Sequence, residues 1–198
     1  MILRALRYYL SERKMPVPGE EQPETIPVPG LDWQRYMGCW YELARIETPF
    51  EYGLDEVWTE YTMLPDGQVD VTNYGTDADG RVYKAKAKAR PVAEGVLQIS
   101  FVPFLRFIST PYHVLRVDEN YQNALVSNET GSCLWILSRL AHAPLSHLLP
   151  LLQDASQRGF DISQLRPTRQ NRGTLCEMTL GERNKMTFFA EKACQEVK

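Results

Sequence analysis

From residue 39 to residue 139 the chain is a succession of short apolar or alternating segments, each closed by a turn signal. Turn-forming runs such as Pro65-Asp66-Gly67 separate them. Eight strands are expected, at 39–47, 56–64, 68–75, 81–90, 95–101, 111–118, 121–127 and 132–139. Short strands joined by hairpin turns at regular spacing predict an all-β fold, an antiparallel up-and-down barrel that closes on itself.

The two ends of this succession carry a pair of residues that fits such a closure. The first strand opens on Gly38-Cys39-Trp40, and the last strand ends on Arg139. A planar guanidinium stacks well on an indole face, so Trp40 and Arg139 are expected to meet across the closed floor of the barrel. Because a barrel of about eight strands is wide enough for one small ligand, the pattern favours a binding protein with a pocket.

Alternation along the strands predicts which side chains face the barrel interior. In the run from Lys84 to Ala89 the lysines belong in water, so the alanines face inward. The predicted ligand-binding set is Glu42, Ala44, Tyr61, Asn73, Tyr83, Ala85, Leu97, Ile99, Phe101, Tyr112, Val114, Trp135 and Leu137. Small alanines beside large aromatic residues fit an open cavity, and the same pattern fits a packed interior. The carboxylate of Glu42 either holds a polar ligand head or is hydrogen-bonded within the barrel.

Basic residues near the expected rim indicate which ligand suits this apolar tube. Arg45, Arg106, Arg116 and the lysines near the rim are predicted to meet a carboxylate or phosphate head group. An amphipathic lipid with one chain fits best, and each buried methylene adds up to about 0.8 kcal/mol to its binding.

Charge and cysteine usage argue against several other classes of function. The 198 residues carry a net charge of −3, so nucleic acid is a poor candidate partner. The four cysteines form no CxxC pair and the three histidines are scattered, so neither a metal nor a cofactor is expected, and His113 is a poor candidate for haem binding. Reduced thiols are the favoured state of the cysteines. Cys133 is the one candidate nucleophile, but no base is evident beside it, and a non-enzymatic protein is expected.

The segments around the strands have expected roles of their own. Residues 1–14 form a basic amphipathic segment that either lies on a membrane surface or packs on the barrel, and the proline-rich residues 15–30 form a linker. The barrel domain is expected at 31–170, with a helical turn at 31–37, a lid at 48–55, a wall helix at 144–158 interrupted by Pro150 and a ninth strand at 164–169; residues 171–198 are a C-terminal extension. No signal peptide or lipid-anchor cysteine is evident. This favours a cytoplasmic or peripherally membrane-associated protein as numbered, and the periplasm or outer membrane if the start site is misassigned.

Four short motifs give the chain a resemblance to a known family. They are Gly38-Cys39-Trp40-Tyr41-Glu42-Leu43-Ala44-Arg45, the pair Asp118 and Tyr121, Trp135-Ile136-Leu137-Ser138-Arg139, and Gly159-Phe160-Asp161-Ile162-Ser163. Over roughly residues 30–168 the chain resembles the lipocalins, specifically the bacterial and apolipoprotein D-like branch. The resemblance implies a barrel with one open mouth that binds small hydrophobic molecules, and fatty acids and lysophospholipids are associated with this branch. It also implies structural roles for Gly38, Trp40, Asp118, Tyr121 and Arg139, and makes Trp135 the best wall contact for a ligand.

The resulting hypothesis is a non-enzymatic protein that binds a fatty acid, lysophospholipid or similar lipid in its barrel, for transport, storage or membrane maintenance. One alternative is a catalytic member of the family that uses Cys133 as a nucleophile. The other is a membrane- or partner-docking protein with a filled barrel, which acts through residues 1–14 and 171–198.

Overall fold

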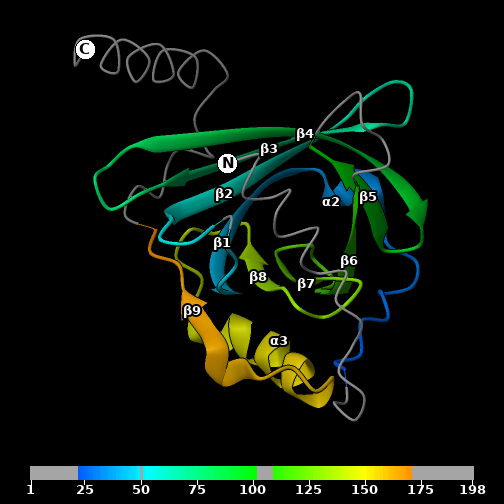
Figure 1. Cartoon of the computed structure of the whole chain (residues 1–198). Helices are drawn as coiled ribbons and strands as arrows, with labels where there is room; N and C mark the ends of the chain where they lie inside the picture. Colours follow the sequence, from blue (N-terminus) through cyan, green and yellow to red (C-terminus); the bar gives the residue numbers. More distant parts are fainter. Residues whose placement is uncertain (1–21, 50, 102–108, 171–198) are drawn as a thin grey trace, which may run out of the picture.

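The computed structural model describes residues 22–49, 51–101 and 109–170, which form a closed antiparallel barrel (Figure 1). Its strands are β1 (Gly38–Ile46), β2 (Asp55–Met63), β3 (Val69–Thr76), β4 (Val82–Ala93), β5 (Val96–Ser100), β6 (Thr110–Val117), β7 (Asn123–Asn128) and β8 (Leu134–Ser138). Each strand pairs with the next along the chain, and β1 pairs with both β2 and β8, which closes the barrel. The predicted all-β up-and-down barrel is therefore confirmed.

The interior of the barrel is lined from alternate positions of each strand. On β4 the lysines face water, while Ala87 and Ala89 are buried. These alanines belong to one continuous apolar cluster with Tyr36, Trp40, Tyr61, Val69, Val71, Leu97, Ile99, Val114, Tyr121, Ala124, Val126 and Leu137. Because successive side chains of a strand point to opposite faces, this alternation produces a solvent-exposed outer surface and a largely apolar inner surface.

A second apolar cluster lies outside the barrel, under helix α3 (Leu145–Gln157). The helix lies along the outside of the wall formed by β7 and β8 (Figure 1). Leu151 and Ala155 of the helix are buried there. They pack with outward-facing side chains of β6, β7 and β8, namely Leu115, Leu125, Leu134 and Ile136. The expected wall helix is thus present, and it continues past Pro150. No helix within the described ranges is long and apolar enough to cross a membrane.

A short ninth strand completes the sheet at the point where β1 and β2 separate. The first half of β1, up to Tyr41, pairs with β2. Its second half pairs with β9 (Leu165–Pro167), which follows the 3-10 turn η1 (Ile162–Gln164). The backbone N–H of Thr168 then donates to the Leu43 carbonyl at 2.9 Å. The chain beyond α3 therefore covers an edge of β1 that β2 leaves uncovered.

One end of the barrel is closed by helix α2 (Trp33–Tyr36), whose N-terminus is capped by the carboxylate of Asp32. The Arg139 guanidinium lies 3.8 Å from the centre of the Trp40 ring, so the predicted pair is in contact. The same guanidinium donates hydrogen bonds to the carbonyl oxygens of Arg35, Tyr36, Met37, Cys39 and Tyr121. One side chain thus ties α2, β1 and the β6–β7 turn together.

The other residues of the implied structural set also serve this floor. Gly38 has a φ of +94°, and a Cβ there would lie 3.3 Å from Arg139 Nη1. Asp118 accepts hydrogen bonds from the Gln122 backbone and the Asn123 side chain, at 2.8 and 2.7 Å. Its turn presents the Tyr121 hydroxyl to the backbone N–H of Asp32 at 2.9 Å. The β6–β7 turn is thereby fixed against α2.

The described part of the expected linker, residues 22–30, runs along the outside of the barrel (Figure 1). The backbone N–H of Val28 donates to the carbonyl of Val114 at 2.8 Å. A Cβ at Gly95 would lie 2.7 Å from Pro27, so only a glycine allows these two segments to approach so closely. This stretch is packed on the barrel and does not act as a free spacer.

Candidate functional site in the barrel interior

A β-bulge in β1 decides which charged side chains enter the barrel. Opposite β8, Glu42 pairs with Leu137, but Ala44 pairs with Ile136, so the register shifts between them. Beyond the bulge, Arg45 faces its cross-strand partner Trp135. The prediction that Ala44 lines the interior is therefore wrong: it packs in the outer cluster under α3, because the extra residue reverses the alternation.

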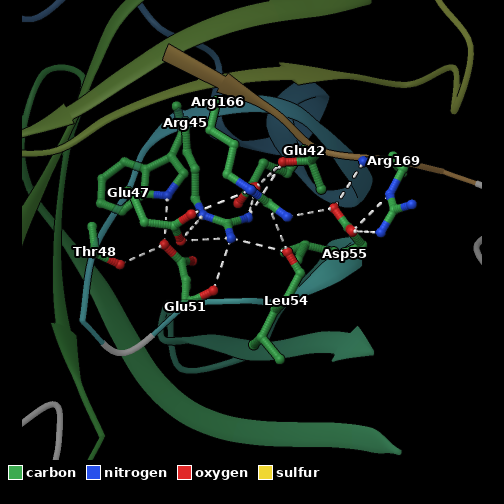
Figure 2. A network of polar contacts seen from close by, with 12 residues as sticks. Glu42, Arg45, Glu47, Thr48, Glu51, Leu54, Asp55, Arg166 and Arg169 are labelled. Carbon is green, nitrogen blue, oxygen red and sulfur yellow. Dashed lines mark hydrogen bonds and ion pairs between the residues drawn. The ribbon is translucent and has the colours of Figure 1, made fainter. Parts of the chain in front are cut away.

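The reversal places Arg45 inside the barrel, where it is fully buried and carries a network of polar contacts (Figure 2). Its Nη1 lies 2.6 Å from Glu42 Oε1, and its Nη2 lies 2.8 Å from Glu47 Oε1. Nη2 also donates to the carbonyl oxygens of Glu51 and Leu54, at 2.8 and 2.9 Å. The prediction that Arg45 stands near the rim to meet a ligand head is wrong, because its donors are taken up within the protein.

The segment that follows β9 seals this network at the seam between β1 and β2. Gln170 Nε2 donates to the carbonyl oxygens of Glu42 and Val57, at 2.7 and 2.8 Å, and so bridges the two separating strands. The Thr168 hydroxyl donates to the Glu42 carboxylate, which is only 3% exposed. The buried carboxylate thus has both a cation and a hydroxyl donor, which offsets much of its desolvation cost.

A second ion-pair centre lies beside the first, around Asp55 at the start of β2 (Figure 2). Its carboxylate meets Arg166 at 3.0 Å and Arg169 at 2.8 Å. Arg166 also reaches Glu47, with Nε 3.3 Å from Oε2. Glu47 therefore links the two centres, so the β1–β2 connection and the chain after α3 are held as one charged assembly.

Glu51 lies in the β1–β2 connection and turns its carboxyl group toward Trp135. Its Oε2 accepts hydrogen bonds from the Trp135 indole N–H at 3.0 Å and from the Thr48 hydroxyl at 2.9 Å. Within the described ranges no Lys, Arg or His nitrogen comes within 4.0 Å of this carboxylate. Burial, and then the nearby charge of Glu42, raise the pKa of Glu51 to about 8. Its neutral acid form is thereby favoured over the carboxylate.

Three tyrosines form a hydroxyl cluster in the interior above α2. Tyr112 shares a hydrogen bond with Tyr36 at 2.7 Å and accepts one from Tyr61 at 3.0 Å. Burial raises the pKa of each of the three phenols, so they remain neutral donors and acceptors. Tyr36 also stacks near Trp40, with ring centres 4.9 Å apart. This cluster joins the floor to the inner wall of the barrel.

Most of the predicted wall residues lie on the inner face. Tyr61, Leu97, Ile99, Val114 and Leu137 are buried in the interior cluster, and Phe101, Tyr112 and Trp135 pack against it. Asn73 accepts a hydrogen bond at 2.8 Å from Thr59, its cross-strand partner on β2. Ala85 is half-buried, whereas Tyr83 is 37% exposed and donates to Asp77, so it stands at the rim. Their contact with a ligand remains a prediction.

Several residues of this interior were not in the predicted set. Tyr36 lies outside the strands, and Glu51 lies in the segment expected to be a lid, so strand alternation says nothing about either. Simple alternation from Trp40 along β1 places Arg45 on the outer face of the barrel. The sequence around Arg45 holds no glycine or proline that would mark the bulge. Of the other predicted basic residues, Arg116 is exposed and Arg106 lies outside the described ranges.

Metal and thiol chemistry have little support among the described residues. No group of three or more His, Cys, Asp or Glu side chains is placed there to hold a metal ion. The His113 ring nitrogen Nδ1 lies 2.8 Å from the Thr25 carbonyl on the outside of the barrel. Cys133 is a buried thiol 3.9 Å from the Ser132 hydroxyl, which is not a base, so the catalytic alternative stays a prediction that requires loss of turnover in Cys133→Ala. Cys39 is disulfide-bonded, so the expectation of reduced cysteines is wrong for this residue.

Comparison with known proteins shows to which family this barrel belongs. The model of the lipocalin-like domain matches residues 31–170. The chain belongs to the lipocalin family. It is 37% identical to temperature-induced lipocalin-1 of Arabidopsis thaliana over 76% of this chain and 86% of the relative. It is 36% identical to the outer membrane lipoprotein Blc of Vibrio cholerae, over 72% and 85%.

The solved structures agree with the fold of this lipocalin. Lobster apocrustacyanin A1 superposes with a TM-score of 0.60 at 18% identity, over 78% of this chain and 93% of the other. The resemblance that the sequence motifs predict is therefore confirmed, including the link to bacterial lipocalins. Lipocalins are in general proteins that bind and transport small hydrophobic ligands, and the apolar interior of this barrel is consistent with that role.

Proposed function

We propose that this lipocalin binds one single-chain amphiphile, such as a fatty acid or lysophospholipid, in the interior of its barrel. The observation that carries the proposal is the division of the inward-facing side chains. Apolar residues line most of the interior, and the charged groups gather on one side. There Arg45 lies opposite Trp135, and Glu51 accepts a hydrogen bond from it. An apolar chain with one polar head matches such a division.

Small side chains on one wall support a cavity of the required kind. The inward alanines of β4, Ala85, Ala87 and Ala89, stand where other strands present leucine or tyrosine. We expect these small side chains to leave room for an acyl chain. Each methylene placed there contributes up to about 0.8 kcal/mol, so chain length is expected to set affinity.

A protein that holds an amphiphile in this way can carry it or store it. Our proposal is that it does so in the transport or storage of lipid and in the maintenance of membranes. Contact with a membrane through residues 1–14 lies outside the described residues and stays a prediction.

Tryptophan fluorescence during titration with lysophosphatidylcholine and fatty acids tests this proposal. Trp135→Phe removes the indole expected to lie beside the ligand head. Trp58→Phe is the matched control, because Trp58 stacks on Tyr74 in a cluster on the outside of the barrel, with ring centres 4.0 Å apart. Saturable quenching in the wild type and in Trp58→Phe, lost in Trp135→Phe, is expected. Absence of a saturable change with every lipid would contradict the proposal.

A further inference from the structure

We infer, resting on the proposed function, that the head group selected by this interior is an ammonium group and that Glu51 is the residue that selects it. A free carboxylate head is disfavoured at the same place. The selecting residue is thus an acid of the interior and not an arginine of the rim.

The interior network around Arg45 contains more carboxyl groups than this cation can pair with. Three carboxyl groups, those of Glu42, Glu47 and Glu51, surround the single guanidinium of Arg45. Glu42 and Glu47 form ion pairs with Arg45, and Glu47 has a second partner in Arg166. Glu51 receives only the neutral donors of Thr48 and Trp135. One carboxyl group of the described network is therefore in excess.

Arg45 is the cation of β1 that lies closest to Glu51, and its hydrogen-bond donors are already used within the protein. Its Nε and Nη2 both donate to Glu47, and its Nη1 donates to Glu42 and to the Thr168 hydroxyl. Nη2 is further taken up by two backbone carbonyls, and the residue has no exposed surface. A carboxylate ligand would have to break these bonds to reach it, at a cost that a rim arginine would not impose.

The carboxyl group of Glu51 has hydrogen-bond donors on one of its two oxygens only. Both hydrogen bonds of its carboxyl group reach Oε2, and within the described residues none reaches Oε1. The indole of Trp135 stands beside the same carboxyl group on the inner wall. The contact runs through the indole N–H, so the edge of the ring meets Oε2. The remaining carboxylate oxygen can attract ammonium and quaternary ammonium groups through its charge.

Proton linkage gives this arrangement a signature that packing alone does not produce. The charged groups around Glu51 are Glu42, Arg45 and Glu47 on β1, with Arg166 behind Glu47 on β9, and Tyr61 on β2 stays neutral. Since the pKa of Glu51 is raised to about 8, an ammonium ligand must displace its proton at neutral pH. Ammonium affinity then rises about tenfold per pH unit below 8 and levels off above it.

Isothermal titration calorimetry with four dodecyl amphiphiles below their critical micelle concentrations tests the inference. Dodecyltrimethylammonium carries the cation alone, dodecylphosphocholine adds a phosphate, dodecyl maltoside is neutral and dodecanoate is an anion. Repeating each titration at pH 7 in buffers of different ionisation enthalpy measures the protons released. We expect both ammonium ligands to bind at least about tenfold more tightly than dodecanoate and to release close to one proton.

Glu51→Gln and an exposed control, Glu129→Gln, make the result specific. The amide oxygen introduced by Glu51→Gln keeps an acceptor for Trp135 and Thr48, so this variant is expected to fold. It should lose proton release and about tenfold of ammonium affinity while its dodecanoate affinity is unchanged. Glu129→Gln should behave as the wild type. Equal binding of all four amphiphiles without proton release, or preference for the phosphate-bearing ligand alone, would overturn the inference, whereas no binding of any amphiphile would overturn the proposed function itself.

Discussion

The barrel contains two arginines that link distant segments, and they are held in opposite ways. Arg139 at the floor stacks on Trp40 and donates to neutral backbone carbonyls. Arg45, in the wall facing the proposed ligand site, is completely buried and is held mainly by carboxylates. Among the described residues no carboxylate forms an ion pair with Arg139, so the floor is a fixed joint. The wall network contains an acid in excess and can respond to a proton or a ligand.

The largest expected effect comes from removing the cation of the wall network. Arg45→Met leaves Glu42 buried and without its ion-pair partner, so the free energy of unfolding should fall by about 3–5 kcal/mol. Urea denaturation measures it. Because the loss comes from an unpaired charge, adding Glu42→Gln in the same chain should restore part of it. A single variant that unfolds within about 0.5 kcal/mol of the wild type would show that the network is not closed around this arginine.

A substitution in the floor that keeps the charge should lower the stability by a smaller amount. Arg139→Lys keeps the charge but loses the planar stack on Trp40 and most of the fork that reaches several carbonyls. We expect a loss of about 2–3 kcal/mol in urea denaturation, with ligand affinity unchanged in the fraction that is folded. If the lysine variant is as stable as the wild type, charge alone holds the floor and the contrast with Arg45 disappears.

A glycine beside the floor arginine gives a finer test of the same joint. Gly38→Ala forces a side chain into a backbone of φ +94° with Arg139 Nη1 only 3.3 Å away, and should cost about 1–2 kcal/mol. Gly67→Ala is the matched control, since its φ is +78° and nothing lies within 4 Å of the added Cβ. The excess loss at Gly38, measured by thermal unfolding, reports the contact with Arg139. Equal losses at the two glycines would mean that backbone strain alone is responsible.

The wall network should also make the stability of the protein depend on pH. Burial raises the pKa of Glu51 to about 8, so its neutral form is the one that the folded protein prefers. Its contribution to stability is therefore fully present below its ordinary pKa and is lost as the pH rises toward 8. Relative to Glu51→Gln, the wild type should lose stability between pH 5 and pH 8 and then level off. Parallel stability curves for the two proteins would remove Glu51 from the account.

The same contrast separates what the sequence predicts from what it does not. The floor follows from Gly38, Trp40 and Arg139 because they stand at the ends of regular strands, where alternation and turn signals apply. The wall network depends on a bulge between Glu42 and Ala44 that no glycine or proline marks, and the shift reverses the roles of Ala44 and Arg45. Glu51 and Gln170 lie outside the expected strands, so only the folded chain brings them to the site.

Intermolecular NOEs between isotope-labelled protein and unlabelled dodecylphosphocholine test the central claim most directly. If the barrel interior holds the amphiphile as proposed, chain protons should give NOEs to Leu97 and Tyr112, and the trimethylammonium protons should give NOEs to the Trp135 indole. NOEs confined to the exposed leucines of α3, Leu145 and Leu149, would place the ligand on the outer surface and would contradict the account.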